Sequence, residues 1–378
     1  MDIAAADFAQ HNIEVRGMLD QDARPEGISP RRLPAWTRVQ LPQNLDVMSR
    51  MPSGVRIRCR TDATSVSLRC QTTNLVEKGG EPFPVNFNLE TGGKLWLQPG
   101  PGGNVLTYDP LRPSSFSLDR GEEQHITFAD LPAGDKDIEL WLPHNAYVEL
   151  RSLSFSDGAT ITPYNTSKRT WVHYGSSISH CMEAEEPAKT WPAVAARIGG
   201  LDLQSLGFGG QCHVDGFTAR TIRDLAPDVI SLKLGINVVN MDSMRERAFV
   251  PAVHNFLDTL REGLPDTRIL VISPIWAPAA ENNPGPTQRD DQNRSITVPG
   301  MESLREGCLT LTRIRMLLEA LVGARNDPNL AYLSGLELFN EADHEDLPDD
   351  LHPNTAGYIR MGERFAAAAF APGQFLAQ

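Results

Sequence analysis

The sequence predicts two domains, an all-β sandwich followed by an α/β domain with a parallel sheet. The chain has 378 residues, which is too long for one ordinary hydrophobic core. Short apolar–polar alternations separated by Pro and Gly clusters fill residues 1–165. Strands that alternate with helical periodicity fill residues 166–378, so we expect the domain boundary close to residue 165.

The first domain is predicted from runs that alternate apolar and polar side chains, the period of a half-buried strand. Residues 55–59 and 66–70 have this pattern, and the turn-like residues 61–64 between them predict a hairpin. Many short strands without helical periodicity are typical of a sandwich or jelly roll. Further strands are expected at residues 85–89, 94–97, 125–128, 137–142 and 147–155.

The cysteines and tryptophans of the first domain are expected in its core. Cys59 and Cys70 fall on the apolar sides of their strands, where a free thiol packs as a small hydrophobic group more often than it pairs. Trp36, Trp96 and Trp141 could stack on sugars, but aromatic side chains on strands mostly pack inward. Carbohydrate binding, closure of one side of an active site and formation of a homo-oligomer remain open as roles for this domain.

The second domain is predicted from strands that alternate with helices, the pattern of a parallel sheet with helices on both faces. In such sheets, ligands bind beyond the carboxyl ends of the strands. Strands are expected at residues 170–174, 202–206, 229–234, 268–273 and 331–336, and helices at residues 190–198, 217–225, 245–262, 301–323 and 355–369.

One segment, residues 277–300, interrupts this alternation and is rich in Pro, Asn, Asp and Gln. A loop of more than about 15 residues without secondary structure is uncommon in a compact domain and often covers or lines a site. A surface insertion without a role is the alternative. Its position directly after the predicted strand at residues 268–273 favours a role near the substrate.

Composition and charge disfavour several kinds of partner. The net charge of −13 argues against nucleic acid and anionic membranes, because both require clustered cations. No apolar run approaches the roughly 18 residues of a membrane span, and the acidic start of the chain does not resemble a secretory signal, so we expect a cytoplasmic protein. The five cysteines form no C-x-x-C pair, which argues against a zinc site. We expect Cys181 and Cys212 to be buried thiols, with a disulfide between them as the alternative.

Ser177 is the candidate nucleophile. It ends a predicted strand at a Gly-containing turn and precedes a helical stretch. Its hydroxyl would therefore project from the sheet edge near a helix N-terminus, where developing negative charge is stabilised. A turn or cap residue is the simpler interpretation of this serine taken alone. Ser176 is the rival nucleophile.

Two further strand ends carry groups that can stabilise an oxyanion. The run Gly207-Phe208-Gly209-Gly210 follows the predicted strand at residues 202–206, and glycines let backbone N–H groups approach a ligand closely. This run has neither the G-x-G-x-x-G spacing nor the lysine of a P-loop. Asn237 follows the most apolar strand, and its amide can donate to an oxyanion. Taken singly, these motifs are a tight turn and an Asx turn.

The last loop before the final helix contains Asp349, Asp350 and His352. A carboxylate three positions before a histidine can orient the imidazole and stabilise its positive charge. This spacing favours Asp349 over Asp350 as the partner of His352. Together, the four loops supply a nucleophile, oxyanion donors and a base with its orienting acid, which is the set of groups that acyl transfer requires.

These four blocks, in this order, resemble the SGNH (GDSL-type) hydrolase superfamily over residues 168–378. The first half of the chain resembles the β-sandwich domain of two-domain esterases and acyltransferases of this superfamily. The resemblance implies that Ser177 is the nucleophile, that His352 is the general base and acid, and that Asp349 orients His352. It also implies an oxyanion hole formed by the backbone N–H groups of Ser177 and Gly210 and by the side-chain amide of Asn237.

The chain departs from the superfamily pattern at two positions. Ser176 stands where an Asp usually precedes the nucleophile, and Val238 stands where an Asp often follows the Asn. Gly209 could replace Gly210 as an oxyanion donor and is, with His180, a candidate substrate-binding residue. A surface position is the simpler expectation for His180. The acidic residues outside the motifs are expected on solvated helix faces.

The expected activity is serine-dependent cleavage of an acyl ester through an acyl-enzyme, without a metal ion or an organic cofactor. If water resolves the acyl-enzyme, the protein is an esterase for a small molecule or a sugar; if a substrate hydroxyl does so, it is an acyltransferase. The outcome depends on whether the pocket excludes water and orients an acceptor. A glycan-binding protein with an inert α/β domain is the remaining alternative, and the complete Ser–His–Asp set argues against it.

Overall fold

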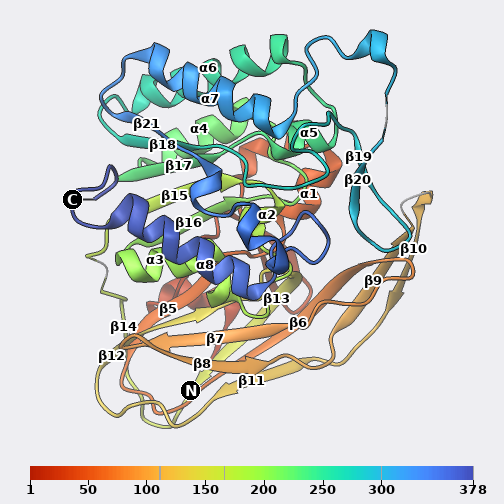
Figure 1. Ribbon diagram of the computed structural model, residues 1–378. Helices are drawn as coiled ribbons and strands as arrows, with labels where there is room; N and C mark the ends of the chain where they lie inside the picture. Colours follow the sequence, from red (N-terminus) through yellow and green to blue (C-terminus); the bar gives the residue numbers. More distant parts are fainter. Residues whose placement is uncertain (110–111, 166, 299, 378) are drawn as a thin grey trace. The chain divides into compact units, whose positions relative to one another are not determined.

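The computed structural model describes residues 1–109, 112–165, 167–298 and 300–377, and the chain divides into two compact units (Figure 1). The first unit comprises Met1–Ser167 and Ala184–Ala188, and the second comprises Lys168–Glu183 and Lys189–Gln378. Residue 166, at the expected boundary, and residue 378, at the expected end of the second domain, lie outside the described residues. In the described ranges, every helix is too short or too polar to cross a membrane.

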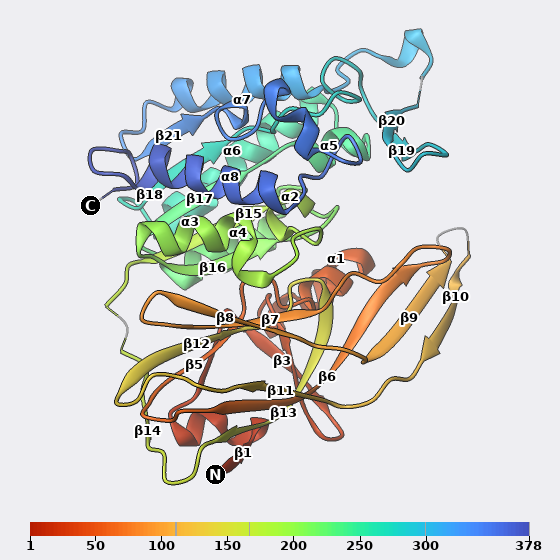
Figure 2. The same ribbon diagram turned by 60° about the horizontal axis from the view of Figure 1, so that its bottom comes forward.

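The first unit is a many-stranded β region in which, among the described residues, one sheet has eight strands and the other six (Figure 2). The larger sheet contains β1 (Asp2–Ala4), β3 (Asp20–Arg24), β4 (Gly27–Arg31), β6 (Val66–Glu77), β9 (Asn104–Asp109), β10 (Arg112–Asp119), β11 (Gln124–Phe128) and β13 (Ala146–Phe155). The smaller contains β2 (Glu14–Arg16), β5 (Arg56–Thr61), β7 (Asn86–Thr91), β8 (Lys94–Pro99), β12 (Lys136–Trp141) and β14 (Ile161–Thr162).

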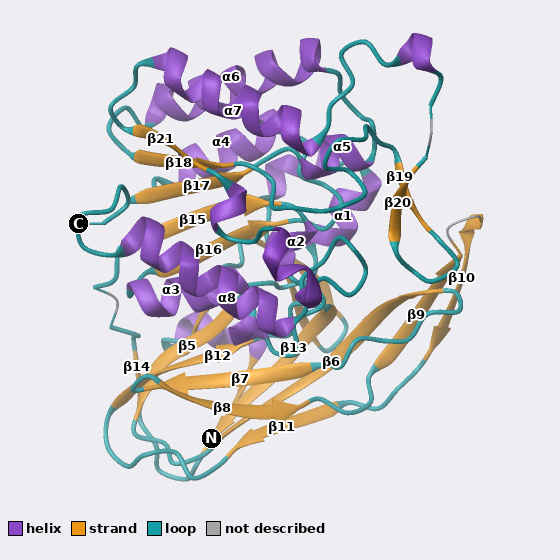
Figure 3. Ribbon diagram, viewed as in Figure 1, coloured by secondary structure: helices purple, strands orange, loops and turns teal. Residues whose placement is uncertain are grey.

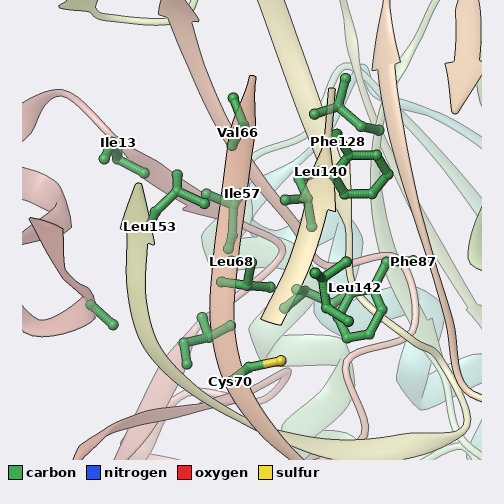
Figure 4. Close-up of a cluster of buried hydrophobic side chains, with 14 of the residues drawn as sticks. Ile13, Ile57, Val66, Leu68, Cys70, Phe87, Phe128, Leu140, Leu142 and Leu153 are labelled. Atoms are coloured by element: carbon green, nitrogen blue, oxygen red, sulfur yellow. The ribbon is translucent and has the colours of Figure 1, made fainter. Parts of the chain in front are cut away.

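The two sheets share one hydrophobic core (Figure 4). Ile57 and Leu140 come from the six-stranded sheet, whereas Leu68 and Leu153 come from the eight-stranded sheet, and each is at most 1% exposed. Because side chains alternate across each strand, one face of a strand can supply residues to this core while the other does not. The prediction of a β-sandwich is confirmed.

The predicted hairpin between residues 55–59 and 66–70 is wrong. The strand β5 pairs with β2, β12 and β14, while β6 pairs with β9, β11 and β13, so the two strands belong to different sheets. The local alternation of side chains specifies a strand and its buried face, but the partner strands come from distant parts of the chain. The turn at residues 61–64 therefore connects the two sheets instead of closing a hairpin.

Cysteines and tryptophans test the predicted core of this unit. Cys59 and Cys70 are free and fully buried, as predicted. Trp141 is buried, and Trp96 is partly buried against the core. The core prediction is wrong for Trp36, whose side chain is 42% exposed because it lies on a short helical turn, Ala35–Gln40, and not on a strand.

The second unit contains a parallel sheet with the order β16-β15-β17-β18-β21, which confirms the predicted α/β class. Its strands are β15 (Thr170–Gly175), β16 (Asp202–Gly207), β17 (Val229–Lys233), β18 (Arg268–Ile272) and β21 (Leu330–Leu333). The strand β15 lies between β16 and β17, so the segments that follow these three strands start from neighbouring positions in the sheet. Such a reversal of strand order is where open α/β sheets bind their ligands.

Helices cover both faces of this sheet (Figure 1). The helix α3 (Trp191–Gly199) packs on α8 (Thr355–Phe365), and α4 (Gly216–Leu225) packs on α6 (Glu246–Gly263). The helix expected at residues 301–323 is α7 (Leu311–Arg325), which starts later because the Thr310 hydroxyl accepts a hydrogen bond from the Arg313 N–H at 3.1 Å and caps it there. The short helices α2 (Ser177–His180) and α5 (Ile236–Asn240) follow β15 and β17.

The insertion at residues 277–300, apart from residue 299, lies within the described residues and is not structureless. It contains a two-stranded antiparallel hairpin of β19 (Thr287–Arg289) and β20 (Ser295–Thr297), drawn in orange in Figure 3. A side-chain turn closes the hairpin, because the Asp290 carboxylate accepts hydrogen bonds from the backbone N–H groups of Gln292 and Arg294. Asp290, Asp291, Gln292 and Asn293, part of the polar composition that suggested a loop, belong to this turn.

Candidate active site

Three predicted site residues leave adjacent strands of the parallel sheet. Ser177 follows β15, Gly210 follows β16 and Asn237 follows β17, and β15 pairs with both of the other strands. Because these strands are parallel, their carboxyl ends lie along one edge of the sheet. The sheet order therefore brings together motifs that are far apart in the sequence.

Ser177 opens α2, and the glycines around it let this helix lie directly on the strand ends. A Cβ atom on Gly207 would come within 2.5 Å of the carbonyl carbon of Ser179 and 2.6 Å of the His180 nitrogen. At Gly175 it would collide with the Ser179 side chain. These two glycines therefore serve the close packing of α2, a role that was not predicted when the run after β16 was interpreted as an oxyanion site or a tight turn.

His352 lies between Ser177 and Asp349. Its Nε2 atom is 2.9 Å from the Ser177 Oγ atom, and its Nδ1 atom is 2.8 Å from the Asp349 Oδ2 atom. The other oxygen of Asp349 accepts hydrogen bonds from the backbone N–H groups of Leu351 at 2.9 Å and of His352 at 2.6 Å. Asp350 turns away, and its carboxylate lies 2.9 Å from the Nε2 atom of His344.

The rival nucleophile has no such partner. Ser176 adopts an extended conformation as the residue that precedes α2, and it is fully buried. Its Oγ atom has no hydrogen-bond partner among the described residues. Ser177 is thus the serine that the fold presents to His352.

A second carboxylate faces His352. The Oε1 atom of Glu183 is 3.6 Å from the Nδ1 atom of His352, and the Tyr358 hydroxyl donates a hydrogen bond to the Glu183 Oε2 atom at 2.7 Å. Burial alone would lower the pKa of His352, but the charges of Glu183 and Asp349 outweigh it and raise that pKa above its usual value. Asp349 itself has a strongly lowered pKa, because the partners His352 and Arg289 outweigh the opposing effect of burial.

The predicted oxyanion donors other than Ser177 lie after β16 and β17. Asn237 is buried, and its Oδ1 atom accepts a hydrogen bond from the Cys212 N–H at 2.9 Å, which fixes the orientation of the amide. The Gly209 N–H is engaged by the Nδ1 atom of His180 at 3.4 Å. Gly210 has a φ of +68°, a conformation that favours glycine. This geometry favours Gly210 over Gly209 as the second donor.

Some expectations for neighbouring residues are corrected. His180 is fully buried beneath the Gly209 turn, so the expectation of a surface position is wrong. Cys181 and Cys212 are free, which confirms the thiols and excludes the disulfide. The expectation that acids outside the motifs are solvated is wrong for Glu183, which faces His352.

Three residues near His352 and Asp349 were not predicted from the sequence, namely Glu183, Arg289 and Tyr358. Glu183 sits in an acidic run and Arg289 in the polar insertion, and neither stretch carries a spacing that signals a partner. Both reach His352 or Asp349 only through the tertiary fold.

Comparison with known proteins places this arrangement in a family. Residues 173–360 match the model of the GDSL-like lipase/acylhydrolase family, and this part of the chain is a domain of that family. No match was found among curated protein sequences. The family and the solved structures that resemble the chain make the protein an enzyme of the esterase or acyltransferase type.

Solved structures resemble the chain over nearly its whole length. A salicylyl-acyltransferase, SsfX3, from a tetracycline biosynthetic pathway is 27% identical, with a TM-score of 0.79, and the match covers 96% of this chain and 95% of that one. A proposed GDSL-like lipase from Bacteroides ovatus is 19% identical, with a TM-score of 0.67 and coverage of 97% and 95%. A family two carbohydrate esterase from Clostridium thermocellum is 14% identical, with a TM-score of 0.57 and coverage of 94% and 97%.

Proposed function

We propose that the protein is a serine-dependent acyl-ester enzyme in which Ser177, His352 and Asp349 form a catalytic triad. The observation that carries this proposal is the continuous chain of contacts from the Ser177 Oγ atom to His352 at 2.9 Å and from His352 to Asp349 at 2.8 Å. A serine hydroxyl is a weak nucleophile at neutral pH, and an adjacent base that an acid holds in place activates it.

In the proposed reaction, His352 carries the proton at each step. The Ser177 oxygen attacks the ester carbonyl carbon while the Nε2 atom of His352 takes the hydroxyl proton. When the tetrahedral intermediate collapses, the same nitrogen returns that proton to the leaving alcohol, and an acyl-enzyme remains on Ser177. A second hydroxyl-bearing molecule then loses its proton to His352 as its oxygen attacks the acyl carbon. The bond from the acyl carbon to the Ser177 oxygen breaks, and His352 returns the proton to that oxygen. Asp349 keeps the Nδ1 proton in place throughout.

The negative charge of the tetrahedral intermediate falls on the former carbonyl oxygen. The backbone N–H groups of Ser177 and Gly210 and the side-chain amide of Asn237 are the donors that we assign to it. The Ser177 N–H is the first in α2 and has no acceptor within the helix. The Asn237 amide presents its NH₂ end, because its oxygen is held by Cys212.

The second nucleophile decides between two activities. Water gives an esterase that cleaves the O-acyl ester of a small molecule or a sugar. A hydroxyl on a small-molecule acceptor gives an acyltransferase, and the similarity to the salicylyl-acyltransferase over 96% of the chain favours this second candidate. The likeness to the carbohydrate esterase, at 14% identity, supports the fold alone.

The test compares Ser177→Ala with Ser176→Ala on p-nitrophenyl esters. We expect Ser177→Ala to abolish turnover and labelling by a fluorophosphonate, whereas Ser176→Ala keeps both. Turnover that persists unchanged in Ser177→Ala would overturn the triad. A series of hydroxyl acceptors added to the wild type then separates the two activities: an esterase yields only free acid, and an acyltransferase diverts product to the new ester.

A further inference from the structure

The hairpin of β19 and β20 holds Asp349 from two sides. Arg289 and Ser295 face each other across this hairpin. The Ser295 N–H donates a hydrogen bond to the Asp349 carbonyl oxygen at 2.9 Å, and the Arg289 Nη1 atom donates to the same oxygen at 3.3 Å. The Arg289 Nη2 atom donates to the Asp349 Oδ2 atom at 2.6 Å. One cross-strand pair of the insertion thus grips both the backbone and the side chain of this acid.

Hydrogen bonds occupy both oxygens of the Asp349 carboxylate and fix its orientation. Its Oδ1 atom accepts two backbone N–H groups, and its Oδ2 atom accepts the His352 Nδ1–H and the Arg289 guanidinium. A carboxylate offers about four lone-pair positions, so all of them are used here. Without Arg289, the Oδ2 atom would keep only its bond to the imidazole.

We infer that Arg289, on the hairpin, is a positioning residue that holds the Asp349 carboxylate against His352. This inference rests on the proposed triad. Arg289 is not a catalytic residue, because it acts on the imidazole only through Asp349 and through its charge.

The hairpin presents the guanidinium in a preformed position. The Asn293 carbonyl oxygen accepts a hydrogen bond from the Arg289 Nη1 atom at 2.9 Å. The turn that carries Asn293 is closed by Asp290, whose Oδ1 atom accepts from the Arg294 N–H at 2.8 Å. A planar guanidinium that is anchored at one nitrogen loses less rotational freedom when its other nitrogen binds a carboxylate. The side chain is 40% exposed, so we expect its effect on folding stability to be small.

Charge gives Arg289 an effect that a merely structural residue would lack. Its Nη2 atom lies 3.4 Å from the His352 Nδ1 atom. Both nitrogens act as donors, so they form no hydrogen bond with each other, and the positive guanidinium repels a positive charge on the imidazole. Among the described residues, the charged groups that face His352 are Asp349, Glu183 and Arg289. Arg289 lowers the pKa of His352 and so partly offsets the increase that the two carboxylates cause. Glu183 also accepts a hydrogen bond from the Tyr358 hydroxyl.

The experiment compares Arg289→Gln with Arg294→Gln, a matched change in the same hairpin. Arg294 is paired with Asp290 and is 52% exposed, so it is the control for the loss of a positive charge. The pH profile of kcat/KM is measured with p-nitrophenyl acetate, and the His352 imidazole is titrated by NMR in protein with labelled histidines. For Arg289→Gln we expect kcat/KM to fall about tenfold, because a hydrogen bond to a charged group is lost. We also expect its acid limb and the imidazole titration to move to higher pH.

The outcomes separate this inference from the proposed function. Arg289→Lys keeps the charge but loses the two-pronged contact, so its acid limb should remain near that of the wild type while its rate stays reduced. If Arg289→Gln coincides with Arg294→Gln in rate, acid limb and imidazole titration, the role of Arg289 is overturned even though Ser177 still reacts with a fluorophosphonate. If Ser177→Ala remains fully active, the triad itself fails, and the NMR titration still reports whether Arg289 acts on His352.

Discussion

The side-chain oxygen of Asn237 accepts a hydrogen bond from the backbone N–H of Cys212 at 2.9 Å. Asn237 lies in α5, the short helix after β17, and Cys212 lies in the loop after β16. This bond connects the two segments that we assign to the oxyanion hole. It also decides which end of the amide is free to donate.

Replacement of Asn237 by Ala should lower kcat about 100-fold with little change in KM, because the donor acts mainly on the charge of the transition state. Asn237→Asp is the matched variant, since a carboxylate can still accept the Cys212 N–H but cannot donate. We expect both variants to lose similar activity in steady-state assays with p-nitrophenyl esters. An Asp variant as active as the wild type would exclude Asn237 from the oxyanion hole.

Replacement of Glu183 by Gln should move the acid limb of kcat/KM to lower pH. Glu183 raises the pKa of His352, and the general base works only in its neutral form. Removal of this charge therefore lets the imidazole lose its proton at lower pH, in the direction opposite to Arg289→Gln. The exposed Glu319, on α7, supplies the control for loss of a negative charge. Identical profiles for Glu183→Gln and Glu319→Gln would contradict the prediction.

His173 should make the protein less stable as the pH falls. The residue is fully buried, with its Nδ1 atom 2.7 Å from Ser231 Oγ and its Nε2 atom 2.8 Å from Ser179 Oγ, and burial lowers its pKa from 6.5 to about 3. Below pH 6.5 the His173 imidazole is protonated in the unfolded chain but stays neutral in the folded protein. The contribution of the neutral His173 to the free energy of unfolding is therefore fully present above pH 6.5 and is lost as the pH falls.

The expected loss from His173 is up to about 1.4 kcal/mol of unfolding free energy per pH unit between about pH 6 and pH 4. Urea unfolding of the wild type and of His173→Gln over this range measures it. In the variant, the free energy of unfolding should change less steeply with pH by that amount, whatever its absolute value. Equal slopes in the two proteins would mean that His173 does not remain neutral in the folded state.

Gly207→Ala should damage both folding and activity, because the new methyl group would meet the backbone of α2, which carries Ser177. We expect a loss of about 1–3 kcal/mol in the free energy of unfolding. Gly323→Ala is the control, since nothing among the described residues lies within 4 Å of the added carbon and Ala favours the interior of α7. The prediction fails if thermal unfolding and turnover of Gly207→Ala match those of Gly323→Ala.

Most secondary structure of both units was predictable because periodicity is local. The alternation in residues 66–70 specified a strand with one buried face, and the spacing of Trp191 and Val194 specified a helix. The choice of sheet for β5 and β6 was not predictable, because strand pairing depends on partners that are distant in the sequence, such as Ile138 for Cys59. Short strands such as β1 escaped because three residues carry no measurable period.

The sequence by itself determined the four motifs, the order in which they occur and the preference for Asp349 over Asp350, because each is a matter of residue type and short spacing. Only the tertiary structure decided the surroundings of His352. Glu183 and Arg289 come from a loop and a hairpin with no motif, and they act over 3.6 and 3.4 Å to the Nδ1 atom of His352. Electrostatic and hydrogen-bond partners depend on distance in space. For residues on separate elements, that distance follows from the fold and not from their spacing along the chain.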